Sequence, residues 1–119
     1  MNKFNRFAAL WGPVIAWCGV IFYLSHIPNL RITREWWDFP LRKAAHMVEY
    51  GILARLLARA FAGSTSWSRK KIFAVSLALA ILYAASDEAH QLFVPGRHGT
   101  PRDVLIDSAG AWLALGIKP

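Results

Sequence analysis

Long apolar segments separated by polar connections dominate the chain. Residues 7–24 contain no charged side chain, and residues 72–86 contain none either. A helix that crosses a membrane needs about 20 mostly apolar residues, with a range of about 17–25. Two further segments, 41–62 and 102–117, are mainly apolar but carry ionisable residues. The pattern predicts an all-α protein, an integral membrane four-helix bundle.

We expect one domain, residues 1–119, with helices at about 7–25, 41–62, 72–91 and 102–117. Pro13 then lies one turn into the first helix, where the missing N–H of proline is tolerated. Gly110 and Ala114 are four residues apart in the last helix. Small residues at this spacing let a neighbouring helix approach closely.

The composition favours a membrane over nucleic acid as the partner. The net charge is +7, but only 18% of the residues are charged, whereas soluble domains carry about 25%. The basic residues lie mostly between the apolar segments, where they suit anionic lipid headgroups. We therefore expect membrane lipids as partners and no nucleic acid. The single cysteine, Cys18, gives neither a disulfide framework nor a metal cluster.

Four helices place both termini on the same side of the membrane. The basic cluster at residues 69–71, together with Lys3 and Arg6, lies on the terminal side. Cytoplasmic loops carry an excess of Lys and Arg, so we expect multi-pass topology with both termini in the cytoplasm.

On this topology, the unusual polar residues gather at the other membrane face. Ionisable groups at membrane depth cost about 2.5–3.5 kcal/mol each on insertion scales, so their clustering predicts a site. We take Asp87 and Glu88 as candidate general bases, with His46 as the partner. The candidate ligand-binding residues, of which the basic ones suit a phosphate, are Lys43, Tyr50, Gln91, Arg97, Asp103 and Asp107.

Two other functions for the cluster stay open, and a metal site is a third that the spacing disfavours. The acids can pair with Lys43 or Arg97 only to hold the helices together, which makes the chain a structural or accessory module. A transporter or proton relay needs an oligomer, because four helices leave little room for a pathway. A metal site from His46, Glu49, Asp87 and Asp103 lacks its usual spacing, since no HExxH motif is present. The sequence contains no P-loop or Rossmann pattern either, so we expect neither a metal nor a cofactor.

Several of these residues resemble the hallmark of the VanZ-like family. The segment from Asp87 to Arg97 matches the family pattern Asp-Glu-x-x-Gln-x-Phe-x-Pro-x-Arg, and Asp103 and Gly110 continue it. Upstream, Lys43, His46 and Tyr50 match Lys-x-x-His-x-x-x-Tyr on the second helix, and Ser25 and Pro28 match the Ser-x-x-Pro that ends the first. The similarity covers almost the whole chain. It departs at Asp107, where the family often has asparagine.

The resemblance implies a bacterial multi-pass protein of the inner (cytoplasmic) membrane. The family takes its name from a member linked to low-level resistance to the glycopeptide antibiotic teicoplanin. From the residues and the resemblance together, we expect a polar site that binds a lipid or cell-envelope intermediate, such as an anionic lipid or lipid-linked precursor. Whether the site is enzymatic is left open at this point.

Overall fold

The computed structural model describes residues 2–26, 38–93 and 101–116. These ranges contain four helices: α1 (Lys3–His26), α2 (Asp38–Ser64), α3 (Arg69–Gln91) and α4 (Pro101–Gly116). Throughout the described ranges, all regular secondary structure is helical. The all-α prediction is therefore confirmed.

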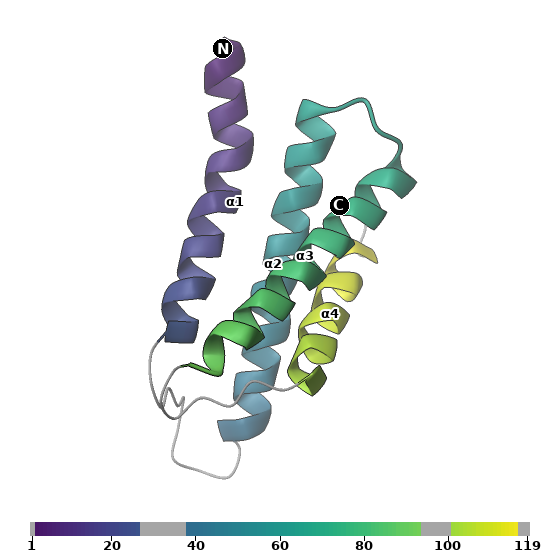
Figure 1. The fold of residues 1–119 in the computed structure, drawn as a ribbon. Helices are drawn as coiled ribbons and strands as arrows, with labels where there is room; N and C mark the ends of the chain where they lie inside the picture. The colour runs from purple at the N-terminus through teal and green to yellow at the C-terminus, as the bar shows by residue number, and fades with distance from the viewer. Residues whose placement is uncertain (1, 27–37, 94–100, 117–119) are drawn as a thin grey trace.

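Helix α2 is the centre of the bundle and packs against the other three helices. Helix α4 packs on α2 and α3, whereas α1 flanks α2 and α3 on another side. In Figure 1 the carboxyl ends of α1 and α3 lie toward the same end of the molecule as the amino ends of α2 and α4. The bundle is elongated, with extents of 47 × 26 × 22 Å. This arrangement brings the expected polar residues of three helices to one end.

Among the described residues, two helices are long and apolar enough to cross a membrane, with spans Lys3–Leu24 in α1 and Arg69–His90 in α3. Helix α4 contains a shorter apolar stretch, Val104–Gly116. Large apolar side chains are exposed along α1, including Phe7, Ile15 and Phe22. An apolar outer surface of this kind suits contact with lipid. The fold is an integral membrane four-helix bundle, as predicted; that α2 and α4 also cross the bilayer stays a prediction.

Helix α1 begins at Lys3, earlier than the expected residue 7, because the helix continues through the polar residues before the apolar run. Pro13 therefore lies in the interior of α1, and the prediction that it lies one turn from the start is wrong. An interior proline removes the hydrogen bond to the carbonyl four residues earlier, which is that of Ala9. Arg59 of α2 donates from Nη1 to this Ala9 oxygen at 3.1 Å. An arginine of the neighbouring helix thus replaces the missing backbone donor.

Helices α2 and α4 come very close to each other at Gly110. A Cβ atom added to Gly110 would lie 2.3 Å from the backbone oxygen of Met47 and 2.6 Å from its Cα. Only glycine fits at such a distance, so the expected close approach at Gly110 is confirmed. On the α2 side, a Cβ atom on Gly51 would lie 3.2 Å from the Ala114 Cβ. These contacts fix how far the polar residues of α4 lie from those of α2.

Candidate functional site

Among the side chains that the structure describes, three carboxylates lie inside the bundle where α2, α3 and α4 meet. Asp87 and Glu88 of α3 are 4% and 5% exposed, and Asp107 of α4 is 0% exposed. Burying a charged group without a partner is costly, so carboxylates in such positions need nearby donors, cations or protons. Helix α2 provides two such partners, Tyr50 and His46.

Asp87 is bound by a tyrosine of α2. The Tyr50 hydroxyl donates to Oδ2 of Asp87 at 3.1 Å, and the Tyr50 side chain is completely buried. The ring of Tyr83 lies 6.2 Å from that of Tyr50, and its hydroxyl donates to the Cys18 carbonyl at 2.6 Å. The two tyrosines connect α1, α2 and α3 beside the carboxylate, so Asp87 is held in one position.

His46, one turn before Tyr50 on α2, faces Asp107 of α4. Its Nδ1 lies 3.4 Å from Oδ1 of Asp107 and 4.0 Å from Oε2 of Glu49. These are ion pairs when the imidazole is protonated. His46 thus has carboxylates of α2 and α4 beside it, and its expected role as partner of the α3 acids stays a prediction.

His46, Glu88 and Asp107 form a group that can hold a metal ion. Each offers one ligand atom, and these atoms all lie within 4.8 Å of one another. One nitrogen and two carboxylate oxygens form a donor set that is common for divalent transition metals. Sequence spacing gave no sign of this group, because the three ligands come from three helices and an HExxH-type motif reports only ligands on one helix. The expectation of no metal rested on the missing HExxH motif, which does not report on ligands from separate helices.

The structure describes the other candidate residues only in part. Lys43 lies in the first half of α2 and is half-buried. The backbones of Gln91 and Asp103 belong to α3 and α4, but their side chains lie outside the described part of the structure, and Arg97 lies outside it altogether. Of the nine candidates, the structure brings together Tyr50 with Asp87 and His46 with Glu88 and Asp107. Their roles stay predictions.

Backbone carbonyls near the cluster are also used for contacts between helices. Trp17 of α1 donates from Nε1 to the Glu49 carbonyl at 2.8 Å. The ring of Phe22, also on α1, lies 4.7 Å from that of His90 at the end of α3. Neither contact was predicted from the sequence. Helix α1 thus supports the polar end of the bundle without adding a carboxylate to it.

A family model described as VanZ/LLP1 matches residues 7–118. The match includes the whole of α2, α3 and α4 and most of α1, so the buried polar cluster lies within it. Comparison with curated proteins and with solved structures gave no match.

Proposed function

This chain belongs to the VanZ-like (VanZ/LLP1) family, and from this premise we propose that its buried polar cluster binds the headgroup of a lipid or lipid-linked cell-envelope intermediate. The observation that carries the proposal is the burial of Asp87, Glu88 and Asp107 at one end of a membrane bundle. Burying three acids in a membrane bundle costs free energy. Apolar residues hold helices together without that cost, so a purely structural module does not need the acids.

The chemistry of the cluster suits a ligand with both a phosphate and hydroxyl groups. Carboxylates accept hydrogen bonds from sugar or glycerol hydroxyls, while Lys43 and Arg97 are the expected phosphate partners. In an enzymatic version, Asp87 or Glu88 removes a proton from the ligand and His46 acts as the proton-transfer partner. The 3.4 Å separation of His46 Nδ1 and Asp107 Oδ1 supports this role, since Asp107 would orient the imidazole.

The proposal places the protein in the bacterial inner membrane, with four crossings and both termini in the cytoplasm. The basic residues Arg69, Lys70 and Lys71 at the start of α3 support this orientation. The polar cluster then faces the outer side, where envelope intermediates are used. We extend the proposal to teicoplanin: susceptibility should change with expression of the chain and depend on the cluster.

A structural module is the second candidate, and specific contacts favour it. The bond from Tyr50 to Asp87 joins α2 to α3, and the pair of His46 and Asp107 joins α2 to α4. Polar contacts between membrane helices contribute about 0.6 kcal/mol each on average. On this view, the cluster fixes helix positions and binds no ligand.

Native mass spectrometry of the detergent-purified protein separates the two. We expect the wild type to retain an anionic lipid or lipid-linked species, counted per protein, of which Arg97→Ala binds one copy fewer while its circular dichroism spectrum is unchanged. Arg6→Ala, which removes a cation from the far end of α1, is the matched control and should retain the species. Asp87→Asn should also bind one copy fewer, although the amide oxygen still accepts the Tyr50 hydroxyl. Equal retention by the wild type and both cluster variants, or none in any of them, would favour the structural module.

A further inference from the structure

A cavity of about 650 Å³ lies at the end of the bundle opposite the carboxylates. Three arginines line it, Arg55 and Arg59 from α2 and Arg69 from α3. Its other walls include the apolar side chains of Leu56, Ile72, Phe73 and Leu115, and its described lining contains no carboxylate. Arg59 is 13 positions after His46 on the same helix, about 20 Å away along its axis. The cavity is therefore separate from the polar cluster.

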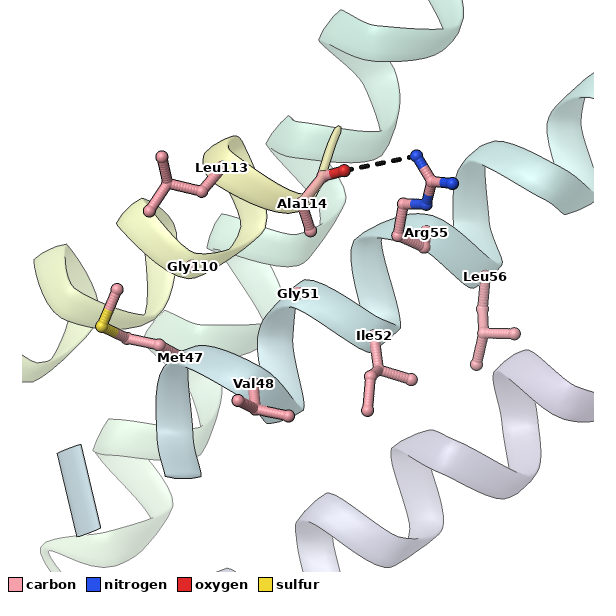
Figure 2. A pocket seen from close by; sticks show the side chains of 9 residues that line it. All are labelled: Met47, Val48, Gly51, Ile52, Arg55, Leu56, Gly110, Leu113 and Ala114. Carbon is pink, nitrogen blue, oxygen red and sulfur yellow. Dashed lines mark hydrogen bonds between the residues drawn. The ribbon is translucent and has the colours of Figure 1, made fainter. Parts of the chain in front are cut away.

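Contacts with neighbouring helices hold two of the arginines in place. Figure 2 shows the guanidinium of Arg55 beside the carbonyl of Ala114, to which it donates at 3.3 Å. Ala114 lies in the last turn of α4, where carbonyls have no partner within the helix. Arg59 is held by its bond to Ala9 in α1. These two bonds position both side chains at the cavity wall. Each bond uses one of the five N–H donors of its guanidinium.

An apolar groove of about 440 Å³ adjoins the cavity between α2 and α4. Arg55 and Leu56 line both spaces. In Figure 2, Val48, Ile52 and Leu56 follow one another along α2. Gly110 and Leu113 form the α4 side. A cationic cavity continued by an apolar groove has the form of a site for a charged head and a hydrocarbon chain.

The apolar span of α3 begins at Arg69, so the cavity lies where that span meets the headgroup layer. We propose that it binds an anionic membrane phospholipid, with the phosphate on the arginines and one acyl chain along the groove. Charge complementarity selects this occupant, because guanidinium groups bind phosphate through paired N–H donors. A zwitterionic lipid would bring its own cation toward three arginines, which is unfavourable.

The test compares phosphatidylglycerol with phosphatidylcholine of the same acyl chains, added to delipidated protein and counted by native mass spectrometry. We expect the wild type to bind phosphatidylglycerol at least tenfold more tightly. Arg69→Gln should lower that affinity about fivefold, the effect of one basic group at an anionic surface. Arg59→Gln with Arg69→Gln should abolish the preference, and Arg6→Gln, on an exposed part of α1, should keep it.

Several outcomes would overturn the proposal. Equal binding of both lipids by the wild type would remove the charge selectivity, and a preference unchanged in Arg69→Gln would remove the arginine cavity as its origin. Arg59 also contacts α1, so the double variant can lose helical content. In that case the single variant Arg69→Gln is the test of the arginine cavity. Displacement of the lipid by an equal concentration of glycerol 3-phosphate would refute the acyl-chain contact. Arg97→Ala should leave this binding intact, which separates it from the function proposed above.

Discussion

Replacing Gly110 by alanine puts a methyl group at the point where α4 touches α2. The new carbon would lie 2.3 Å from the Met47 backbone oxygen, whereas ordinary contact begins at 3.4 Å. The obstacle is backbone, so no side-chain rotation relieves it, and the two helices must separate by about 1 Å.

The cost follows from two opposing effects. Overpacking of this kind costs about 1–3 kcal/mol, while alanine in place of a helical glycine recovers up to about 1 kcal/mol. We expect Gly110→Ala to lower the free energy of unfolding by about 1–2 kcal/mol. Asp107 lies one turn before Gly110, so the same shift should lengthen its 3.4 Å contact with His46.

Two other glycines provide graded controls. A Cβ on Gly51 would meet its nearest neighbours at 3.2 and 3.3 Å, a mild conflict, and one on Gly12 would meet nothing within 4 Å. Thermal unfolding in detergent, followed by circular dichroism, should rank Gly12→Ala as most stable, Gly51→Ala near the wild type and Gly110→Ala as least stable. If Gly110→Ala unfolds at the same temperature as Gly12→Ala, the close approach of α2 and α4 is not as described.

Two further predictions concern polar contacts between helices. Tyr50→Phe removes the hydroxyl bound to buried Asp87 and should lower the free energy of unfolding by about 0.6–1.7 kcal/mol in denaturant titration, without loss of helical content; wild-type stability would show that this bond contributes nothing. Pro13→Ala restores an N–H for the Ala9 carbonyl, so Arg59→Gln should cost about 0.5–1.5 kcal/mol less in that background, as measured by a double-mutant cycle. Strict additivity would argue that Arg59 does not replace the missing donor.

The fold was predictable because a membrane selects for composition. Uncharged runs such as residues 72–86 indicate a crossing helix without knowledge of any partner. The start of α1 was less predictable, since helix formation does not stop where apolar residues stop. Because the start of α1 was predicted too late, Pro13 was expected near the start of the helix and not in its interior. The bond between Arg59 and Ala9 depends on how α1 and α2 pack, so neither residue alone predicts it.

The candidate site was predictable within each helix but not between helices. His46 and Tyr50 are four positions apart, so the sequence alone places both on one side of α2. Their partners depend on how α3 and α4 are rotated against α2. That rotation is set by backbone contacts such as the one between Gly110 and Met47. Periodicity carries no information about it, so the pairs with Asp87 and Asp107 had to come from the structure.

The origin of the cluster on three helices has a consequence for biogenesis. Ribosomes make α4 last, so α2 and α3 enter the membrane before Asp107 exists. Until α4 docks, His46 lacks its 3.4 Å neighbour, and Glu88 lacks the third member of its group. The insertion machinery therefore handles an incomplete set of ionisable groups, which must stay hydrated or protonated. Docking of the final helix is the step that turns a membrane-inserted chain into one with a finished site.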